Sequence, residues 1–285
     1  MAAHSVERLL LVGGGKMGAA LLTGWLKGGL AVENVAVVEP DAANAAKLAA
    51  LGIVVADDVS GLPGDFAPHI IVFAVKPQVM DAVAPMYKGL AAGGAMVLSI
   101  AAGVPIARFE SHLGAVPVVR SMPNTPAAIG RGMTVACANE LVTDTQKAAC
   151  GKLLEAVGEV AWVDDEAHMD AVTAVSGSGP AYVFLMIECL AAAGEAAGLE
   201  PALAAQLAGA TVGGAGELAR QASEDPARLR INVTSPAGTT EAALKVLMAD
   251  DGLAQLMSRA VEAAANRSRE LAKGQAVGQE IAENR

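Results

Sequence analysis

The stretch Leu9-Leu-Leu-Val-Gly-Gly-Gly-Lys-Met-Gly-Ala-Ala20 decides the fold. An apolar run of strand character leads directly into Gly13-x-Gly15-x-x-Gly18 and then into a helical pattern. In such a turn the first glycine permits a tight bend, the second lets the backbone approach a pyrophosphate, and the third lets helix and strand pack closely. The pattern therefore predicts dinucleotide binding, and the alternative is a purely structural glycine turn. The turn comprises Gly13, Gly14, Gly15, Lys16, Met17 and Gly18.

Beyond this turn, short apolar strands alternate with helical stretches up to about residue 164. Such alternation predicts βαβ units, and the strands read as continuous apolar runs because helices cover both faces of a parallel sheet. The expected strands are residues 9–13, 35–39, 53–55, 70–74, 95–100, 116–120, 134–138 and 159–163. The expected helices are residues 16–27, 42–51, 79–90, 105–112 and 143–157. We therefore expect an α/β, Rossmann-like dinucleotide-binding domain over residues 1–164.

The second half of the chain, residues 165–285, loses the strand signal. Ala, Leu, Gly, Met and Glu recur there at helical spacing, with interruptions expected at residues 176–180, 198–201, 225–226 and 234–238. The small residues permit close approach of neighbouring helices, but they bury little apolar area within one chain. We therefore expect an all-helical domain that dimerises with a second copy.

The composition excludes several classes of protein. The 285 residues include 20 Lys and Arg against 30 Asp and Glu, a net charge of −10, so no nucleic-acid partner is expected. The longest uncharged run, Gly89–Ala107, is divided by glycines and a proline. The first eight residues lack the pattern of a targeting leader. We expect a soluble, cytoplasmic protein with no membrane partner.

The cysteines and histidines are spaced too widely to form a metal or redox site. Cys137, Cys150 and Cys189 are odd in number, so the sequence predicts buried free thiols rather than a disulfide framework. The four histidines are isolated, and none belongs to a cluster with ligand spacing. No metal is expected.

An acid at the end of the second expected strand bears on the choice of dinucleotide. Glu39 follows Gly18 by 21 residues, where an acid commonly accepts hydrogen bonds from ribose hydroxyls and repels a 2′-phosphate. Nothing cationic follows in residues 40–44. These residues favour NAD over NADP, and the alternative is a solvent-facing acid at a strand end.

Further turns marked by proline or hydroxyl residues are candidate binding sites. Lys76, before Pro77, is a candidate partner for a cofactor phosphate, or else a solvated lysine before a helix-starting proline. Asn124 lies in a rigid turn between two prolines, which is compatible with a structural role or with cofactor contact. Ser178 and Ser235 each open a predicted helix with hydroxyls and exposed N–H groups, which suits a carboxylate, and ordinary N-capping is the alternative.

Taken together, several of these segments resemble the pyrroline-5-carboxylate reductase family. The most specific are Met122-Pro-Asn-Thr-Pro, Ser176-Gly-Ser-Gly-Pro-Ala-Tyr and Ser235-Pro-Ala-Gly-Thr-Thr, supported by Ala74-Val-Lys-Pro-Gln and Ser99-Ile-Ala-Ala-Gly. The resemblance implies reduction of 1-pyrroline-5-carboxylate to L-proline with NAD(P)H, the last step of proline biosynthesis. It also implies a homodimer through the helical domain, often assembled into larger rings of dimers.

The resemblance also implies roles for individual residues. The implied cofactor contacts are the glycine turn from Gly13 to Gly18, with Glu39, Asp58, Ala74, Val75, Lys76, Pro77, Ala101, Ala102 and Asn124. The implied substrate contacts are Ser178, Ser235, Gly238, Thr239 and Thr240. Among these, we expect Thr240 to act in catalysis by hydrogen bonding the ring nitrogen of the imine.

The chain departs from the family pattern at several positions. The family usually uses NADPH, whereas Glu39 and Asp58 add negative charge near the adenosine and favour NADH. Lys16 stands where Asn or Gln is usual. Ala237 replaces the first glycine of the substrate loop, and Ile231 replaces an acidic residue that usually precedes it.

Two other functions share this architecture. A β-hydroxyacid dehydrogenase-like oxidoreductase would need a lysine acid/base in the first long C-terminal helices, but residues 171–218 contain no lysine. A non-catalytic dinucleotide-sensing protein would bind the cofactor without turnover. The two turns suited to an anion argue against such a sensor.

Overall fold

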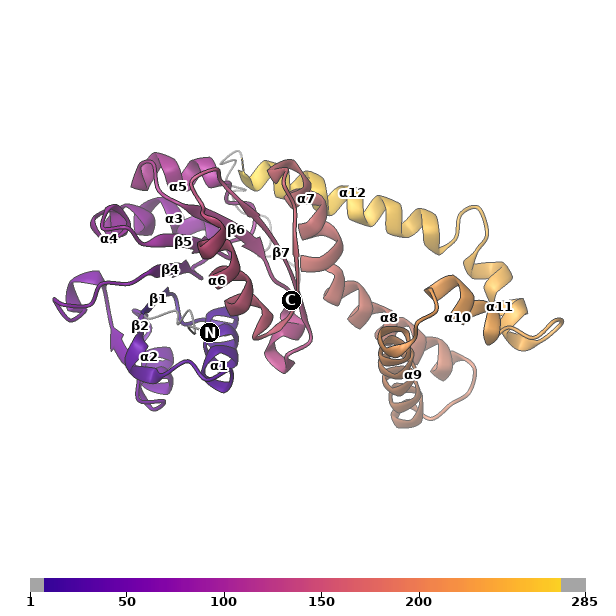
Figure 1. Cartoon of the computed structure of the whole chain (residues 1–285). Helices are drawn as coiled ribbons and strands as arrows, with labels where there is room; N and C mark the ends of the chain where they lie inside the picture. The colour runs from indigo at the N-terminus through magenta and orange to yellow at the C-terminus, as the bar shows by residue number, and fades with distance from the viewer. Residues whose placement is uncertain (1–7, 273–285) are drawn as a thin grey trace, which may run out of the picture. The chain divides into compact units, whose positions relative to one another are not determined.

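The computed structural model describes residues 8–272 (Figure 1). The described residues exclude residues 1–7 and 273–285. The expectation of no targeting leader falls on residues 1–7 and so lies outside the described residues. By their contacts, the described residues up to Gly177 and those from Ala265 onward form one compact unit, and Ser178–Ala264 form another.

The first unit is built on an eight-stranded sheet of order β3-β2-β1-β4-β5-β6-β7-β8. The strands are β1 (Leu9–Val12), β2 (Val35–Val38), β3 (Val54–Ala56), β4 (Ile70–Phe73), β5 (Met96–Ser99), β6 (Val118–Met122), β7 (Gly132–Ala138) and β8 (Gly158–Trp162). All eight expected strands are confirmed to within two residues. The expectation of a wholly parallel sheet is wrong at one place, because β6 and β7 pair antiparallel through the short connection between them.

Helices flank this sheet on both faces, as its apolar strands predict (Figure 1). They are α1 (Lys16–Lys27), α2 (Ala42–Ala49), α3 (Met80–Val83), α4 (Lys88–Ala92), α5 (Ile106–Leu113) and α6 (Asp144–Glu155). The single helix expected over residues 79–90 is instead divided into α3, a 3₁₀ turn at Ala84–Tyr87, and α4. Pro85 explains the division, because proline has no N–H to donate and its ring crowds the preceding turn.

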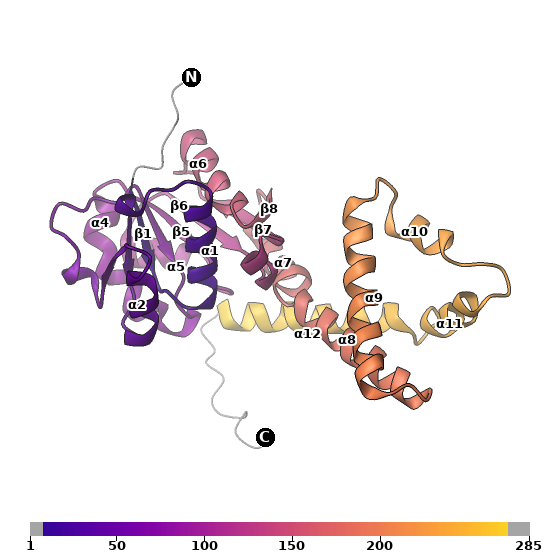
Figure 2. The same cartoon turned by 90° about the horizontal axis from the view of Figure 1, so that it is seen from below.

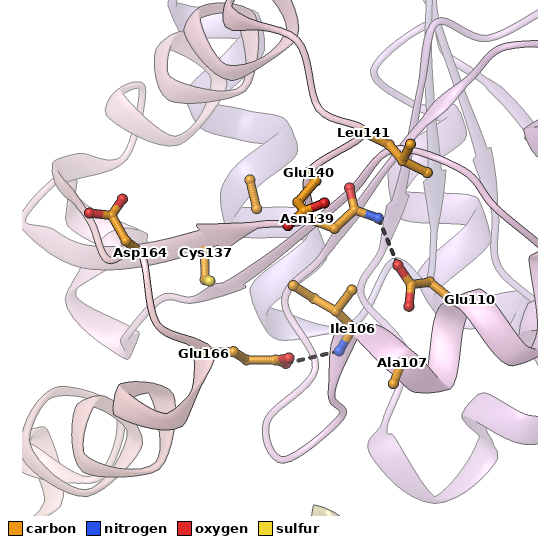
Figure 3. Close-up of a pocket in the computed structure, with 10 residues that line it drawn as sticks. Ile106, Ala107, Glu110, Cys137, Asn139, Glu140, Leu141, Asp164 and Glu166 are labelled. Carbon is orange, nitrogen blue, oxygen red and sulfur yellow. Dashed lines mark hydrogen bonds between the residues drawn. The ribbon is translucent and has the colours of Figure 1, made fainter.

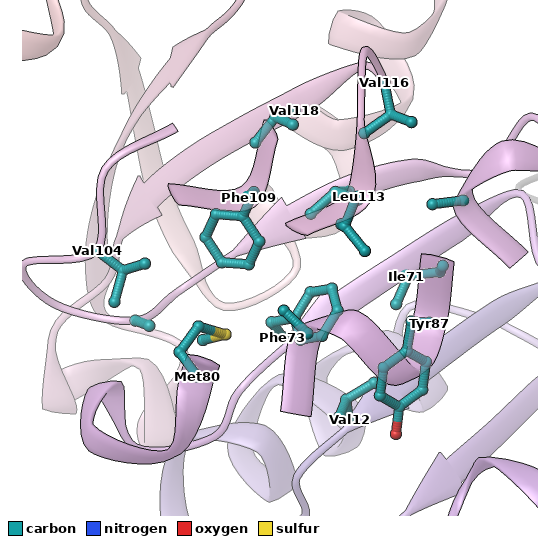
Figure 4. Close-up of a cluster of buried hydrophobic side chains, with 14 of the residues drawn as sticks. Val12, Ile71, Phe73, Met80, Tyr87, Val104, Phe109, Leu113, Val116 and Val118 are labelled. Atoms are coloured by element: carbon teal, nitrogen blue, oxygen red, sulfur yellow. The ribbon is translucent and has the colours of Figure 1, made fainter. Parts of the chain in front are cut away.

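The strand residues alternate between two apolar cores, one on each face of the sheet. Leu10 and Val12 face one core, whereas Leu9 and Leu11 face the other, as the two-residue period of a strand requires. In the first core the ring of Phe73 lies 5.3 Å from Tyr87 in an edge-to-face arrangement and 5.4 Å from Phe109 (Figure 4). These aromatic contacts fasten the helices to the sheet beside the carboxyl ends of its strands.

The second unit is wholly helical, as the sequence predicts. Its elements are α8 (Gly179–Ala196), α9 (Pro201–Gln221), α10 (Pro226–Asn232), α11 (Thr239–Leu247) and most of α12 (Leu253–Ala272). Helices α8 and α9 pack against each other (Figure 2). A Cβ placed on Gly194 would lie only 3.3 Å from the Cβ of Ala204, so small residues do set the approach of these helices.

The interruption expected at residues 176–180 takes the form of a helix irregularity rather than a loop. Between α7 (Met169–Val172) and α8 lie a π-helical turn at Thr173–Gly177 and a bend at Ser178. Pro180 falls in the first turn of α8, where a missing N–H costs little. The other three interruptions are confirmed, and a further break separates α11 from α12.

The second unit has almost no core of its own. No residue of α8 is buried, and Ala204 and Ala208 are the buried residues of α9. Large apolar side chains of α8 remain exposed, with Phe184 and Leu185 each at 57%. The helical stretch Glu166–Ala196 is long and apolar enough to cross a membrane by length and composition. An exposed apolar surface of this kind marks an interaction site.

Candidate functional site

The turn between β1 and α1 has the geometry that its glycine spacing predicts. Gly13 adopts φ +99°, a value that favours glycine, and its N–H donates to the carbonyl of Val38 at 2.9 Å. A Cβ on Gly18 would lie 2.2 Å from the carbonyl oxygen of Gly13, so the helix packs too closely on the strand for any side chain. A Cβ on Gly15 would meet no protein atom within 4 Å. The backbone at Gly15, the N-cap of α1, is therefore open to a ligand.

Glu39 follows β2 and turns its carboxylate into the glycine turn. The residue is 6% exposed, its Oε2 accepts the N–H of Gly14 at 2.6 Å, and its Oε1 accepts the N–H of Asp41 at 2.9 Å. The alternative of a solvent-facing acid is therefore wrong. Because a carboxylate offers about four acceptor sites, capacity remains for a ribose hydroxyl beside the turn.

Asp58 follows β3, and Glu39 follows β2. These two strands pair in parallel, and the Glu39 N–H donates to the Ala56 carbonyl at 2.9 Å. Both acids therefore lie at the carboxyl ends of their strands. The Oδ1 of Asp58 accepts the hydroxyl of Ser60 at 2.6 Å and the N–H of Ser60 at 2.7 Å. These two hydrogen bonds, the hydroxyl first, lower the pKa of the Asp58 carboxyl. The side chain is therefore a carboxylate at neutral pH.

A cavity of about 300 Å³ lies at the carboxyl ends of β4, β5 and β6, where neighbouring parallel strands end at one edge. It gathers eight of the residues that the sequence analysis assigns to the cofactor: Met17, Ala74, Val75, Lys76, Pro77, Ala101, Ala102 and Asn124. It also includes residues that the sequence analysis missed as site residues: Ile100, Met122, Pro123, Thr125 and Gly177. Three of these belong to the Met122-Pro-Asn-Thr-Pro turn, so this motif could have predicted them as site residues.

The amide of Asn124 is held in one orientation within this cavity. Its oxygen accepts the N–H of Met133 at 2.9 Å, so its nitrogen points the other way and donates to the hydroxyl of Ser176 at 3.3 Å. Ser176 belongs to the π-helical turn, and the next residue, Gly177, lies so close to Met122 that a Cβ there would be 2.3 Å from its terminal methyl. Asn124 therefore has a structural hydrogen-bond network in addition to its place in the cavity wall.

A second cavity, of about 410 Å³, lies beside the start of α5 and the end of β7 (Figure 3). Three of its polar side chains, Glu110, Asn139 and Glu166, make structural contacts. Glu166 Oε1 accepts the N–H of Ile106 at 2.9 Å and a guanidinium N–H of the buried Arg120 at 2.8 Å. Asn139 donates to Glu110 at 2.9 Å. We regard this cavity as part of the structural framework rather than the active site.

Two of the three cysteines are buried free thiols. Burial raises the pKa of the Cys150 thiol to about 12, and burial followed by Glu166 raises the pKa of the Cys137 thiol. Cys189 is exposed in this chain, so the expectation of a third buried thiol is wrong. Among residues 8–272, no three His, Cys, Asp or Glu side chains are grouped to hold a metal ion.

The expected substrate loop lies between α10 and α11 in the second unit. Ser235 and Gly238 close a turn, in which the Gly238 N–H donates to the Ser235 carbonyl at 3.0 Å. Thr239 and Thr240 are the first two residues of α11, and Gly238 is its N-cap. The loop therefore brings four of the five expected substrate residues together at a helix N-terminus, where a carboxylate binds favourably.

The fifth expected residue, Ser178, lies on a different element. It precedes α8, where the backbone already has helical angles and the serine side chain makes no capping hydrogen bond. The π-helical turn at Thr173–Gly177 leads into α8 through Ser178 alone, so no loop precedes this helix start. No hydrogen bond joins Ser178 to the substrate loop in the part of the chain that the structure describes.

Comparisons with known proteins agree with this geometry. Residues 166–271 match the family model for pyrroline-5-carboxylate reductase dimerisation, and residues 8–103 match that for NADP oxidoreductase, coenzyme F420-dependent. The pyrroline-5-carboxylate reductase of Pseudomonas aeruginosa is 41% identical over 273 residues, covering 94% of this chain and 98% of the relative. A Coxiella burnetii pyrroline-5-carboxylate reductase structure aligns with TM-score 0.87 and 34% identity, covering 94% of this chain and 99% of that one. The Plasmodium falciparum pyrroline carboxylate reductase structure with NADP bound aligns with TM-score 0.80 and 30% identity, covering 94% and 100%.

The Rossmann-like sheet, the open glycine turn and the helical second unit define a nicotinamide-dinucleotide-dependent oxidoreductase with a dimerisation domain. Within that class, the identity and coverage of the relatives decide the family. The chain belongs to the pyrroline-5-carboxylate reductase family.

The open space at Gly15 leads to a prediction about cofactor binding. Gly15→Ala leaves the unfolding midpoint within about 2 °C of wild type, since the added methyl meets no protein atom. It lowers affinity for the dinucleotide at least about tenfold, because the methyl occupies the space of the pyrophosphate. Fluorescence titration with NADH and NADPH measures this, with Gly64→Ala, which is also in open space, as the control. Unchanged affinity for both dinucleotides would contradict the assignment.

Proposed function

We propose that this protein reduces 1-pyrroline-5-carboxylate to L-proline. The reduced nicotinamide supplies a hydride to the imine carbon, and the ring nitrogen carries a proton in the product. The observation that carries this proposal is the glycine turn open at Gly15 together with the open start of α11, where Gly238 is the N-cap and no side chain caps the helix. The names of the relatives support the same substrate.

In this proposal the substrate loop holds the carboxylate of the substrate. The N–H of Gly238 is already donated to Ser235, so the carboxylate is left with the N–H groups and hydroxyls of Thr239 and Thr240. Thr240 hydrogen bonds the ring nitrogen. Ser178 and Ser235 supply further hydroxyls for the substrate, and protonation of the imine in solution before binding meets the need for a proton.

Thr240 is tested by removing its hydroxyl. Thr240→Ala lowers kcat/KM for 1-pyrroline-5-carboxylate by about 10- to 100-fold, the value of one hydrogen bond to a charged group. The Kd of the reduced cofactor stays within about twofold, because the glycine turn is untouched. Loss of absorbance of the reduced nicotinamide measures turnover, and Thr240→Ser, which keeps the hydroxyl, is the control. Wild-type turnover by Thr240→Ala would contradict the assignment.

We further propose that the preferred cofactor is NADH. A 2′-phosphate on the adenosine ribose would be placed beside the Glu39 carboxylate, which the N–H groups of Gly14 and Asp41 hold in place. The ionised Asp58 adds a second negative charge at the same sheet edge. The cavity at β4, β5 and β6 would hold the nicotinamide part of the cofactor, and Lys76 in its wall would pair with a cofactor phosphate.

The preference is tested by comparing the two reduced cofactors. Glu39→Ser lowers the ratio of kcat/KM for NADH to that for NADPH by at least about tenfold, because it removes a ribose acceptor and the repulsion of a phosphate. Glu33→Ser is the control, since Glu33 is exposed just before β2, at its opposite end from Glu39. An unchanged ratio in Glu39→Ser would contradict the proposal.

We also propose a cytoplasmic homodimer that buries the exposed apolar side chains of α8. The match to a reductase dimerisation family over residues 166–271 supports this use of the surface rather than a membrane span. A larger ring of such dimers remains a prediction of the family resemblance.

The dimer is tested by the mass of the protein in solution. Sedimentation gives an even multiple of the 28.5 kDa chain mass. Phe184→Asp, which puts a charge on the exposed face of α8, shifts the mass toward one chain. Ile129→Asp, at a residue 78% exposed in the first unit, is the control and keeps the wild-type mass. A monomer mass for the wild type at all concentrations would exclude the dimer.

A further inference from the structure

The substrate loop contains a backbone conformation that its sequence does not favour. Ala237 has φ +58°, the one positive φ of a non-glycine residue among residues 8–272. It is the third residue of a turn that starts at Ser235, with Pro236 second and the Gly238 N–H donating back to Ser235. Such turns normally have glycine or asparagine at the third position, because a Cβ is crowded there. Something outside the turn must hold Ala237 in place.

Glu241 provides that restraint. Its Oε2 accepts the N–H of Ala237 at 2.5 Å, and its Oε1 lies 3.3 Å from the ammonium of Lys245. Glu241 is the third residue of α11, from which a glutamate commonly reaches back to the residue before the helix. Here it reaches one residue further, to the strained alanine itself.

The same arrangement leaves the start of α11 open. Because the N-cap is Gly238, no side chain caps the first turn of the helix. The backbone N–H groups of Thr239 and Thr240 donate to no protein acceptor in the described part of the chain. Any rotation of the Ala237 peptide would change the direction of Gly238 and hence of these N–H groups.

We propose that Glu241 is a positioning residue for the substrate carboxylate, which it serves by holding Ala237 at positive φ so that the start of α11 keeps its binding geometry. This inference rests on the proposed function of the loop. Glu241 acts through the backbone and does not touch the substrate.

Two other roles for the same carboxylate predict different results. As a proton donor to the imine, Glu241 would be essential to kcat, and glutamine would not replace it. As a competing anion beside the carboxylate site, it would weaken substrate binding, and its removal would lower KM. A positioning role predicts that the hydrogen-bond acceptor matters and the charge does not.

The first experiment separates acceptor from charge in the full-length enzyme. Glu241→Ala raises KM for 1-pyrroline-5-carboxylate about tenfold, with kcat and the cofactor KM within about twofold of wild type. Glu241→Gln keeps an acceptor oxygen and leaves KM within about threefold. For 1-pyrroline, which lacks the carboxylate, kcat/KM is the same in Glu241→Ala and wild type.

The second experiment removes the strain instead of the restraint. Ala237→Gly adopts positive φ without help, so it leaves KM within about threefold of wild type. In the Ala237→Gly background, Glu241→Ala raises KM by less than about threefold, because glycine no longer needs the hydrogen bond. This non-additivity is the signature of coupling through the turn.

Several results would overturn the proposal: an unchanged or lowered KM in Glu241→Ala, a collapse of kcat in Glu241→Gln, an equal loss with 1-pyrroline, or no rescue by Ala237→Gly. Circular dichroism checks that each variant folds. If Glu241→Ala does not fold, Glu241→Ser, whose hydroxyl is too short to reach Ala237, carries the same expectations. Failure of the wild type to oxidise NADH or NADPH with 1-pyrroline-5-carboxylate would instead reject the proposed function itself.

Discussion

The close packing of α1 on β1 at the glycine turn is the constraint on which the cofactor site depends. Because Gly18 lies against the Gly13 carbonyl and Gly13 against the carbonyl of Ala74, no side chain fits between the strand ends and the helix. This contact aims the N-terminus of α1 at the carboxyl edge of the sheet, where neighbouring strand ends form the cavity wall. The aromatic contacts of Phe73 with Tyr87 and Phe109 hold the end of β4 against the helical segments that cover it.

One glutamate in each unit has the same structural role, which is to accept a backbone N–H from a turn. Glu39 accepts the N–H of Gly14, and Glu241 accepts the N–H of Ala237, so each carboxylate fixes a backbone turn that precedes or borders a helix N-terminus. The consequences differ with the ligand. In the proposed function, the charge of Glu39 would disfavour a 2′-phosphate on the adenosine ribose, whereas the charge of Glu241 is partly offset by Lys245 and would leave the neighbouring N–H groups to an anionic substrate.

The two units differ in what stabilises them. The first buries its strands between two layers of helices, so its fold follows from apolar runs and turns within one chain. The second exposes residues such as Phe184 on α8 and buries only small side chains of α9. This exposed apolar surface lies in the part of the chain that matches the reductase dimerisation family.

The sequence by itself determined the eight strands, the helical second half and the glycine turn, because these depend on local periodicity and on residues with unusual backbone freedom. Only the tertiary structure decided the antiparallel β6–β7 pair, the π-helical turn at Thr173–Gly177, and the burial of Glu39. The last two depend on non-local contacts, since the fit of Gly177 against Met122 and the reach of Glu39 to Gly14 join residues far apart in the chain. The direction of β7 depends on its pairing with β6, which the apolar pattern of a strand does not specify. In the sequence, Ala237 is visible only as a replacement of the glycine usual in this loop. Its positive φ and its hydrogen bond to Glu241 are visible only in the folded loop.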